Sequence, residues 1–464
     1  MDHQPQSHRA HDPKVAIIGT GLAGSVLASR LKSVCQLTVF ERGDAAGAAP
    51  TDIAMSGHQT GMNPLFYYGV GGTTNLWAGG LIDLLPSEFA GHWPQDVSAE
   101  LPGYYPKVVA ELYGEPDATD WKQRQSQRLG ENSTLSSLFY PHSGPFRVAD
   151  SPLLDDCDIR TVSQVTALRD MGAETEIVYE CAGETNTARF DWVIVAAGGI
   201  GSPVLLQRSG LGGHAVGQNY TDHPMGFVAK VSKVGQGALL KTLRQIGYGG
   251  GNGNAMIKIQ DRVSGLHSGF YFRSAAHGRL TSDPYARSFK VLAERDRFRR
   301  IYAAVSQFHD ADFRNQAIED RCRIRLHSPF SYVLVVNEQE ATGQGQVVAV
   351  SHSEPVLRRW TISPTVTGAI ERNLETLREI LNCEIRTAGD GIEKRLYAAA
   401  HLSGTCRMSS DPDLGVVDKN LLVHGTSRIF VCDGSVLPST GASNTGLTIA
   451  ALAHRLADHL CKAI

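Results

Sequence analysis

The 464-residue chain lacks the features that mark membrane, secreted and nucleic-acid-binding proteins. No segment approaches the run of about 18 apolar residues that a membrane-spanning helix needs, so we expect no membrane span. The polar N-terminal stretch has no apolar core, which argues against a secretory signal peptide. Lys and Arg number 44 against 47 Asp and Glu, a net charge of −3, so no basic excess indicates nucleic acid or an anionic membrane as a partner.

Paired cysteines are also missing. The eight cysteines are scattered and none forms a C-x-x-C pair, the spacing typical of redox and zinc-binding motifs. In a chain of this size they are interpreted as reduced, mostly buried thiols, which favours a cytoplasmic protein, and we expect no metal site. Glycine, by contrast, is plentiful at 48 residues and is consistent with several tight loops around a cofactor.

The most informative stretch that is present is Lys14–Arg42. An apolar run, Val15–Ile18, leads into Gly19–Gly24, which reads G-x-G-x-x-G. A helical pattern follows, and then a second β-rich run, Leu37–Phe40, that ends at Glu41. Strand, tight turn, helix, strand and acid in this order predict a dinucleotide-binding unit far more strongly than the glycine motif alone.

Each part of this motif has a physical role. Gly19 permits the turn, Gly21 lets the backbone approach a pyrophosphate, and Gly24 lets helix and strand pack closely. The helix N-terminus offers unpaired N–H groups to the phosphates. Glu41 stands where a ribose hydroxyl would be gripped, and an acid there argues against an NADP-type ligand. The motif does not distinguish FAD from NAD. A glycine-rich turn that binds no ligand is the weaker alternative.

A second glycine-rich stretch, Tyr67–Gly80, carries too much glycine for a regular helix or strand. One interpretation is a flexible surface loop. Against it, the stretch contains Tyr67, Tyr68, Leu76 and Trp77, which a solvated linker would not carry. A packed loop lying close to a flat ligand accounts for both features.

The rest of the chain shows two kinds of pattern, and its length favours two interleaved domains. Trp192–Ala196 is a near-continuous apolar run, typical of a strand buried on both faces, and residues 428–464 repeat a strand, loop and amphipathic helix. Residues 226–395 mix strand-like segments with helical ones at 285–294 and 366–380, which suggests an antiparallel sheet with helices. We predict an α/β Rossmann-type cofactor domain (10–225 and 396–464) interleaved with an α+β substrate-binding domain (226–395).

In combination and order, these motifs resemble those of the glucose-methanol-choline (GMC) flavoprotein oxidoreductases. The matching segments are Gly19–Gly24 with Glu41, Gly69–Gly80, Ala196–Gly210, Gly217–Pro224 and His401–Leu460. The match is weak over the predicted substrate domain. The resemblance implies an FAD-binding domain whose region 61–150 covers the flavin, and an FAD-dependent enzyme that oxidises the CH–OH group of a small-molecule alcohol. It leaves the electron acceptor open among oxygen, a quinone and a protein.

The resemblance also assigns roles to individual residues. Glu41 would hold the adenosine ribose, and the backbone at Val162 would meet the adenine. Asp433 and Gly434 would lie near the pyrophosphate and ribityl chain, and Thr445 would contact the pyrimidine edge of the flavin. The residues expected at the FAD are Gly19, Gly21, Leu22, Ala23, Gly24, Glu41, Arg42, Gly71, Gly72, Thr73, Asn75, Leu76, Trp77, Ala78, Val162, Ala197, Asp433, Gly434 and Thr445.

His401 and Asn444 occupy the family's catalytic positions. His401 would remove the hydroxyl proton as hydride leaves for flavin N5, because a neutral imidazole is a natural base near pH 7. Asn444 would hydrogen-bond the same substrate oxygen. Without the resemblance, a single loop histidine would more often be structural, and His223 and His424 are interpreted as structural.

Two departures from the family patterns refine the expectation. The stretch Gly71–Trp77 has no histidine where members with covalent flavin carry one, so noncovalent FAD is expected. Its G-G-x-x-x-x-W form looks more like the pyranose-oxidase branch, in which the flavin is attached at the position of Leu76. This second departure favours the hydroxyl of a sugar, a cyclitol or another polyol as the group oxidised.

Three other functions are alternatives. A redox-neutral, lyase-type enzyme on the same FAD-containing fold is the first of them. A non-catalytic flavin-binding module is the second, and the presence of both His401 and Asn444 argues against it. A nicotinamide-dependent dehydrogenase would leave the loop at 69–80 and the C-terminal motifs without a role.

Overall fold

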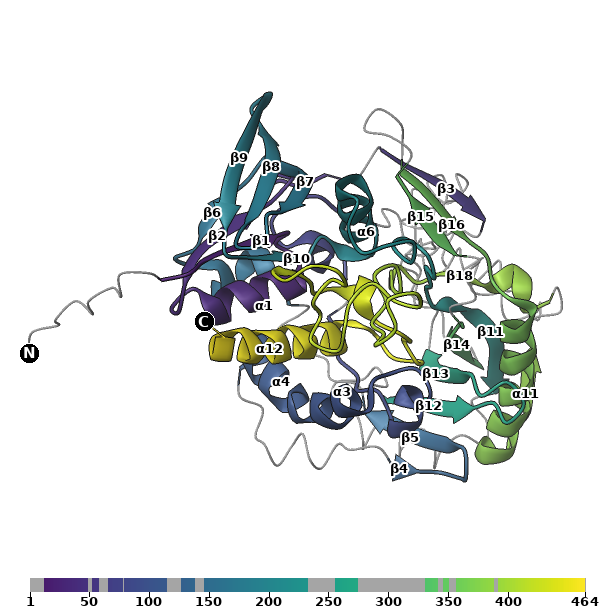
Figure 1. The fold of residues 1–464 in the computed structure, drawn as a ribbon. Coiled ribbons are helices and arrows are strands. Elements are labelled where there is room, and N and C mark those ends of the chain that lie inside the picture. Colours follow the sequence, from purple (N-terminus) through teal and green to yellow (C-terminus); the bar gives the residue numbers. More distant parts are fainter. Residues whose placement is uncertain are drawn as a thin grey trace, which may run out of the picture.

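Two sheets organise the chain in a computed structural model, with a parallel sheet at the upper left of Figure 1 and an antiparallel sheet at its lower right. The structure describes residues 12–48, 52–57, 66–77, 79–114, 127–137, 146–232, 255–273, 330–340, 345–349, 356–387 and 391–463. The helix that the sequence predicts at 285–294 lies outside these residues. Within the described ranges, no helix has the length and apolar character that crossing a bilayer requires.

The parallel sheet has five strands among the described residues, in the order β19-β10-β1-β2-β6. They are β1 (Lys14–Ile18), β2 (Gln36–Phe40), β6 (Asp158–Arg160), β10 (Trp192–Val195) and β19 (Ile429–Val431). All neighbouring strands in this sheet run parallel. The last four residues of β1 are apolar and buried, as a parallel strand with both faces covered requires. The strand β19, from the far end of the chain, completes the sheet as the sequence pattern predicts.

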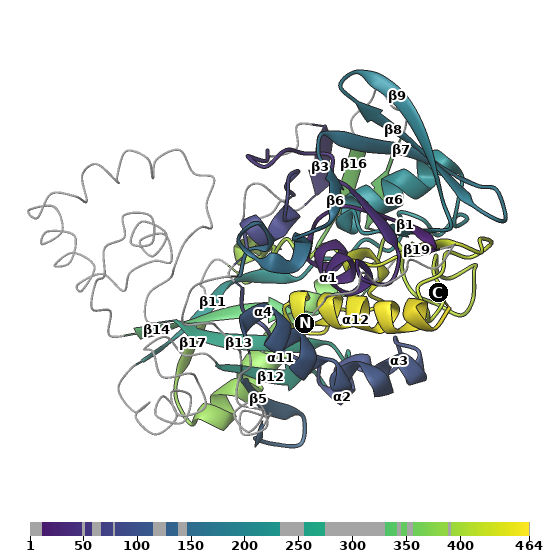
Figure 2. The ribbon, with the colours of Figure 1, turned by 90° about the vertical axis from the view of Figure 1, so that its left-hand side faces the viewer.

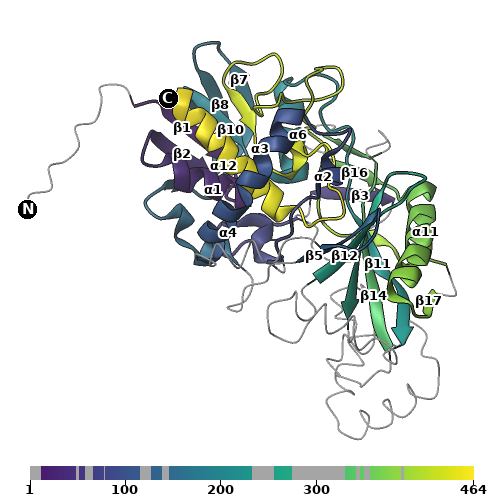
Figure 3. The same ribbon diagram turned by 90° about the horizontal axis from the view of Figure 1, so that it is seen from below.

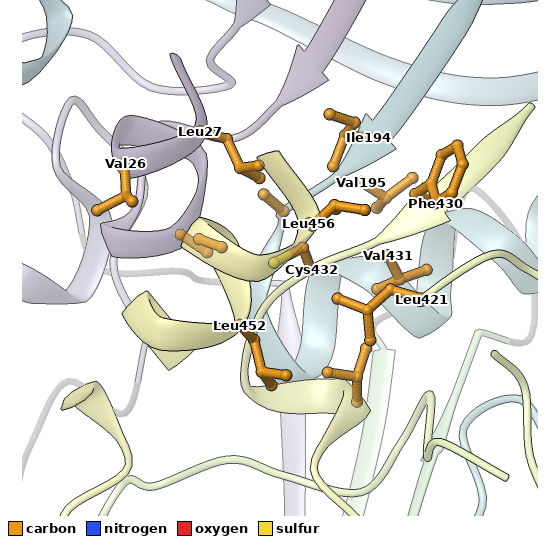
Figure 4. Packing of buried hydrophobic residues seen from close by; sticks show 14 of the residues in the cluster. Val26, Leu27, Ile194, Val195, Leu421, Phe430, Val431, Cys432, Leu452 and Leu456 are labelled. Carbon is orange, nitrogen blue, oxygen red and sulfur yellow. The ribbon is translucent and has the colours of Figure 1, made fainter. Parts of the chain in front are cut away.

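Two helices from opposite ends of the chain pack side by side on this sheet. They are α1 (Leu22–Leu31) and α12 (Gly446–Ala463). Figure 4 shows Leu27 of α1 and Leu456 of α12 gathered with Ile194 and Phe430 of the sheet. A third helix, α4 (Tyr105–Tyr113), packs against α12, so that α12 lies between α1 and α4 in Figures 1 and 2. Full burial of one such leucine side chain contributes about 1.5–3 kcal/mol, so this cluster anchors the C-terminal segment to the parallel sheet.

An antiparallel ribbon projects from the parallel sheet at the top of Figure 1. Its strands are β7 (Ser163–Asp170), β8 (Thr175–Cys181) and β9 (Glu184–Phe190). The ring of Phe40 at the end of β2 meets those of Tyr179 and Phe190 edge-on, at centroid distances of 5.0 and 6.0 Å. The helix α6 (Gly198–Ser209) follows β10 and packs on β7, so the ribbon is fixed to the sheet at two places.

The antiparallel sheet has eight strands among the described residues, in the order β17-β11-β14-β13-β12-β5-β4, with β18 also paired to β11. They are β4 (Gln127–Arg128), β5 (Ser133–Ser137), β11 (Pro224–Ser232), β12 (Ala255–Gln260), β13 (His267–Arg273), β14 (Phe330–Asn337), β17 (Ile385–Thr387) and β18 (Tyr397–Ala398). An antiparallel sheet beside the parallel one confirms the predicted fold class. The domain boundaries stay a prediction, and β4 and β5 join this sheet from the region expected to cover the flavin.

One long helix, α11 (Pro364–Leu381), packs against this sheet, as Figure 3 shows. Ser363 caps its start, because the Oγ accepts a hydrogen bond from the Thr365 N–H at 3.2 Å, and Pro364 occupies the first turn. Asn382 ends it in a left-handed conformation, at φ 45°. The helix buries Ile370, among others, on the sheet.

Smaller elements connect these layers. A three-stranded sheet comprises β3 (Ile53–Gly57), β15 (Gln346–Val348) and β16 (Val356–Trp360). Two further short helices are α2 (Pro86–Phe89) and α3 (Gln95–Glu100). The 3-10 turns in the described residues are η1 (Gly72–Asn75), η2 (Leu101–Gly103), η3 (Val148–Asp150), η4 (Pro152–Leu154), η5 (Glu393–Arg395) and η6 (Gly434–Val436).

Candidate active site

An open cavity lies at the carboxyl ends of the parallel strands. Its volume is about 980 Å³, a figure that includes space open to solvent. Residues that end or follow four of the five strands line it, namely Ile18, Glu41, Ala196 and Asp433. In open α/β sheets, ligands bind outside this edge of the sheet. The fold therefore places the cavity where a dinucleotide would lie.

Three glycines of the G-x-G-x-x-G turn stand in different surroundings. A Cβ on Gly19 would lie 2.5 Å from the Ala196 carbonyl oxygen, and one on Gly24 would lie 2.0 Å from the Gly19 carbonyl oxygen. A Cβ on Gly21 would meet no protein atom within 4 Å. Gly19 and Gly24 are thus required by the packing of strand and helix, whereas Gly21 faces open space in the cavity wall.

The N-terminus of α1 forms the floor of this part of the cavity. Gly21, Leu22 and Ala23 line it, and the helix has no side-chain cap. The first N–H groups of an α-helix have no partner within the helix, and together with the helix dipole they attract anions. This end of the cavity is therefore suited to a pyrophosphate.

The second glycine-rich stretch is packed, as the sequence analysis favoured. Gly72 and Thr73 line the cavity, and a Cβ on Gly72 would approach the Gly21 Cα to 3.2 Å. The Trp77 Nε1–H donates to the Phe146 carbonyl oxygen at 2.5 Å, and the Trp77 ring lies against Gly446 at the start of α12. The loop therefore joins the N-terminal turn to the C-terminal helix.

Not every residue expected at the FAD from this stretch lines the cavity. Asn75 donates its side-chain amide to the Val70 carbonyl oxygen at 2.9 Å. The expected residues outside the cavity lining here are Gly71, Asn75, Leu76 and Trp77. Ala78 lies outside the described residues. The roles of all five at the FAD stay predictions.

Glu41 is buried and accepts four hydrogen bonds from the protein. Its donors are the Thr20 N–H at 3.1 Å, the Thr20 hydroxyl at 2.5 Å, the Gly43 N–H at 2.9 Å and the Gly69 N–H at 3.1 Å. The carboxylate thus ties the glycine turn to the 69–77 loop, a function that sequence reasoning missed. The neighbouring Arg42, which also lines the cavity, pairs with Asp52 at 2.9 Å.

Asp433 serves as a similar anchor on the other side of the sheet. Its carboxylate accepts from the Gly198 N–H at 2.8 Å, the Ser202 hydroxyl at 2.6 Å and the Ser435 N–H at 2.8 Å. Burial raises the pKa of this carboxyl group above its ordinary value. Asp433 and Gly434 line the cavity with Ala197.

Val162 sits in the turn between β6 and β7. Its side chain is 55% exposed, its φ is 52°, and its N–H donates to the Gly43 carbonyl oxygen at 3.1 Å. Ser163 and Val165, rather than Val162, line the cavity. The proposed contact of Val162 with adenine stays a prediction.

His401 and Thr445 also line this cavity. The His401 backbone N–H donates to Asp222 Oδ1 at 2.9 Å, and its Nδ1 is 2.7 Å from His223 Nδ1. His223 Nε2 is 2.8 Å from the Gly441 carbonyl oxygen, and its backbone N–H donates to the same Asp222 Oδ1 at 2.8 Å. The two rings meet edge-on with centroids 5.0 Å apart.

Both histidines are neutral at pH 7. Desolvation lowers the pKa of His401 to about 4, although one side of the residue stays partly exposed to the cavity. Burial, and then the proximity of His401, lowers the pKa of His223 to about 3. Burial raises the pKa of Asp222 to about 6, against the opposing effect of the hydrogen bond from the His401 N–H.

Asn444 does not line the cavity, although it adjoins Thr445 in the chain. Its side-chain amide donates to the Gly80 carbonyl oxygen at 3.3 Å. The structure therefore brings His401 and Thr445 to one cavity and places the Asn444 side chain beside it. The catalytic role of Asn444 stays a prediction.

A buried ion pair holds the loop before Asn444. The Lys258 ammonium donates to Glu88 Oε2 at 2.7 Å, to the Asp83 carbonyl oxygen at 2.8 Å and to the Ser443 hydroxyl. Glu88 Oε1 accepts from the Ala442 N–H at 2.7 Å. Both charged side chains are 0% exposed. Burial opposes ionisation of Glu88, but the Lys258 charge and further donors outweigh it, so the pKa of Glu88 lies below its ordinary value.

Two segments of the chain match models of the same family. Residues 161–225 and 348–453, which include His223 and His401, match GMC oxidoreductases. Over these two segments the chain is therefore similar to GMC oxidoreductases. This agrees with the resemblance drawn from the motifs, whereas nothing in the comparisons favours the pyranose-oxidase branch.

Curated relatives match over parts of the chain. The 6'''-hydroxyparomomycin C oxidase of Streptomyces lividus is 41% identical over 101 residues, which are 19% of this chain and 18% of that relative. An uncharacterised GMC-type oxidoreductase of Rhodococcus erythropolis is 23% identical over 332 residues, which are 66% of this chain and 57% of that relative. The chain thus aligns with less than two thirds of the length of either relative.

Solved structures match over nearly the whole length. Pyridoxine 4-oxidase from Mesorbium loti superposes with a TM-score of 0.61 at 17% identity, covering 97% of this chain and 99% of that one. An FAD-dependent oxidoreductase from Chaetomium thermophilum gives a TM-score of 0.59 at 16% identity with the same coverage. At such low identity these similarities establish the fold alone.

Proposed function

We propose that this chain binds FAD noncovalently in the cavity and oxidises an alcohol to the corresponding carbonyl compound, with His401 as the base. The observation that carries the proposal is that one cavity joins an uncapped helix N-terminus behind G-x-G-x-x-G to a neutral histidine. The first feature suits a dinucleotide and the second suits proton removal from a hydroxyl group.

The residues along the cavity fit an FAD. Gly21 and the N-terminus of α1 would hold the pyrophosphate, Glu41 would lie at the ribose, and Thr445 would contact the flavin, and all of them line the cavity. The absence of histidine between Gly71 and Trp77 supports noncovalent attachment. FAD, when bound, supplies an acceptor for a hydride, that is, for two electrons and one proton.

The chain's own part in the reaction is to bind, orient and deprotonate the alcohol. His401 would accept the hydroxyl proton at a ring nitrogen, and its low pKa keeps the ring neutral, and so able to take up a proton, at pH 7. Removal of this proton while the hydride leaves lowers the energy barrier to forming the carbonyl group. Asn444, which precedes Thr445 in the chain, would orient the substrate oxygen after its amide leaves the Gly80 carbonyl oxygen to which it donates in this structure.

A sugar or other polyol hydroxyl is the substrate class that we propose. The relative from Streptomyces lividus is named for oxidation of a paromomycin compound, and a paromamine 6'-oxidase of Streptomyces fradiae is 44% identical over 91 residues, which are 18% of this chain. The G-G-x-x-x-x-W form of the loop at Gly71–Trp77 supports the same class. Other matches are named for pyridoxine and long-chain alcohols, so the test below includes both.

The test is anaerobic reduction of the bound flavin. The purified protein is expected to be yellow and to release its flavin when it is precipitated with acid. It is then mixed under nitrogen with D-glucose, myo-inositol, paromamine, pyridoxine, benzyl alcohol and dodecanol. Loss of flavin absorbance with a polyol supports the proposal, and loss with another alcohol alone would change only the substrate class. A protein that purifies without flavin, or whose flavin no alcohol reduces, contradicts it, and a redox-neutral lyase would leave the flavin oxidised.

A further inference from the structure

Three groups form a continuous hydrogen-bonded series that ends at His401, which lines the cavity. The Gly441 carbonyl oxygen is 2.8 Å from His223 Nε2, and His223 Nδ1 is 2.7 Å from His401 Nδ1. Both histidine separations are hydrogen-bond distances, so one atom of each pair carries the hydrogen. From the sequence, His223 is interpreted as structural. The series joins positions 178 and 218 residues apart, which no local pattern connects.

The carbonyl oxygen decides where each hydrogen lies. A carbonyl oxygen can only accept, so His223 Nε2 must carry a hydrogen and donate it to Gly441. Because the His223 ring is neutral, its Nδ1 then has a lone pair and can only accept. The hydrogen between the two rings therefore belongs to His401 Nδ1. A neutral His401 with a hydrogen on Nδ1 has a lone pair on Nε2.

We propose that His223 is a positioning residue that fixes His401 in the tautomer whose Nε2 is unprotonated and able to accept the substrate proton. The inference rests on the proposed role of His401 as the base. It assigns His223 a chemical function, since a His401 in the other tautomer would present an N–H to the hydroxyl group and could not deprotonate it.

Asp222 fixes the backbone of both histidines. Its Oδ1 accepts from the backbone N–H groups of both His223 and His401, at 2.8 and 2.9 Å. Tyr220 donates its hydroxyl to Asp222 Oδ2 at 3.3 Å. Among the described residues, the charge of Arg358 and the hydrogen bond from Tyr220 lower the pKa of Asp222, and the charge of Lys258 lowers that of His223. The pair of histidines is thus held by partners within the protein.

The same series also receives the charge that the reaction creates. When the hydroxyl O–H bond breaks and the Nε2–H bond forms, the electron pair of the neighbouring C–H bond leaves with the hydride, and His401 gains one positive charge. The His401 Nδ1–H then points at the His223 lone pair, which makes a charge-assisted hydrogen bond. His223 therefore stabilises the protonated base as well as orienting the neutral one.

Two substitutions separate the chemical role from a structural one. His223→Asn places an oxygen near the position of Nδ1 and keeps an acceptor for His401. His223→Gln places an amide N–H near the position of Nε2, keeps the bond to Gly441 and removes the acceptor. The two variants are matched in charge and in chemistry, and they differ in which of the two hydrogen bonds survives.

The tautomer itself is read by NMR of the FAD-containing protein labelled with ¹⁵N-histidine, in which the nitrogen shift distinguishes protonated from unprotonated ring positions. The His401 signal is the one lost in His401→Ala. We expect wild type and His223→Asn to show hydrogen on Nδ1 of His401, and His223→Gln to show a larger share on Nε2. A wild-type His401 with its hydrogen on Nε2 overturns the proposal, even when neither variant folds.

The rate of anaerobic flavin reduction gives the second measurement. His223→Gln is expected to lose about 10- to 100-fold, the range that corresponds to one charge-assisted hydrogen bond, and His223→Asn is expected to lose less. Equal losses in the two variants would contradict the proposal. The two proposals can fail separately, because the tautomer is measured without any substrate. If His401 shows the expected tautomer but no alcohol reduces the flavin, only the proposed oxidation is refuted.

Discussion

Two buried polar clusters support the two sides of the candidate active site, and they work by different means. The Asp222–His223 cluster holds His401 through two neutral rings and a shared carboxylate. The Lys258–Glu88 cluster holds the loop before Asn444 through a fully buried ion pair. The first cluster touches a ring that lines the cavity, whereas the second touches backbone and a serine hydroxyl.

The difference separates control of chemistry from control of shape. A neutral series of hydrogen bonds sets which nitrogen carries a hydrogen, and changing it alters reactivity more than stability. A buried ion pair fixes the loop only while both charges are present, because either charge alone is costly in a medium that solvates it poorly. Perturbing the ion pair should therefore affect folding, and perturbing the histidines should affect the reaction.

The largest expected effect is on the ion pair. Lys258→Met leaves the Glu88 carboxylate buried without its cation, and should lower the free energy of unfolding by about 3–5 kcal/mol. Denaturant unfolding followed by fluorescence measures this loss. Lys419→Met is the matched control, because Lys419 pairs with Asp96 on the surface, where the side chains are 54% and 44% exposed, and its loss should change little. Equal stability of Lys258→Met and wild type would contradict the assignment.

Asp222 gives the next largest effect. Asp222→Ala removes the acceptor of two buried backbone N–H groups and should lower the free energy of unfolding by about 1–3 kcal/mol. Asp222→Asn keeps an oxygen for both donors and should retain most of the stability. Thermal unfolding of the two variants compares them, and similar melting temperatures would show that these hydrogen bonds do not hold the cluster.

Gly21 tests the cavity without touching either cluster. A Cβ there meets no protein atom within 4 Å, and the φ of −62° suits any residue, so Gly21→Ala should fold normally. The methyl group would project toward the pyrophosphate and should weaken FAD binding about 10- to 100-fold, the equivalent of one charge-assisted hydrogen bond. Gly103→Ala, also in open space but away from the cavity, is the control. Unchanged FAD affinity in Gly21→Ala would place the pyrophosphate elsewhere.

The smallest expected effect is that of pH on flavin reduction between pH 7 and 5. With the pKa of His401 at about 4, the base stays unprotonated over this range and the rate should be nearly constant. A base with the ordinary histidine pKa would lose most of its activity below pH 6. Rapid-mixing reduction at several pH values distinguishes the two, and an acid limb near pH 6.5 would show that His401 is not desolvated as described.

Both histidines make the protein less stable as the pH falls. Their folded-state pKa values lie below the ordinary value, so the unfolded chain binds more protons between about pH 6.5 and 4, and their contribution to stability is lost as the pH falls through that range. Asp222 acts in the opposite direction, because its pKa is raised to about 6 and its burial costs more as the pH rises from about 4 to 6.

The parallel half of the fold could be predicted from sequence because its signals are local. The turn at Gly19–Gly24, the apolar strand before it and the acid at Glu41 lie within one stretch, and each constrains the others. The C-terminal strand and α12 follow the same pattern of alternating apolar and glycine-rich segments. His401 could be proposed because it belongs to a recognisable motif.

The supports of the site could not be predicted, because they join distant residues. His223 meets His401 across 178 positions, and Lys258 meets Glu88 across 170. No sequence period indicates that two loop residues will share a hydrogen bond in a core. Glu88 and Lys258 would each be expected on the surface from their side chains alone, and only the fold shows that they neutralise each other. The strands β4 and β5 were missed for a related reason, since they are short and polar and depend on β12 for their pairing.

The most direct test of the account is the rate of anaerobic flavin reduction in His401→Ala, measured with the alcohol that reduces the wild-type flavin fastest. Both proteins are first shown to hold equal FAD. The account predicts a loss of about two to four powers of ten, the usual contribution of a general base. A His401→Ala protein that holds FAD and reduces it at nearly the wild-type rate would contradict the claim that His401 removes the substrate proton.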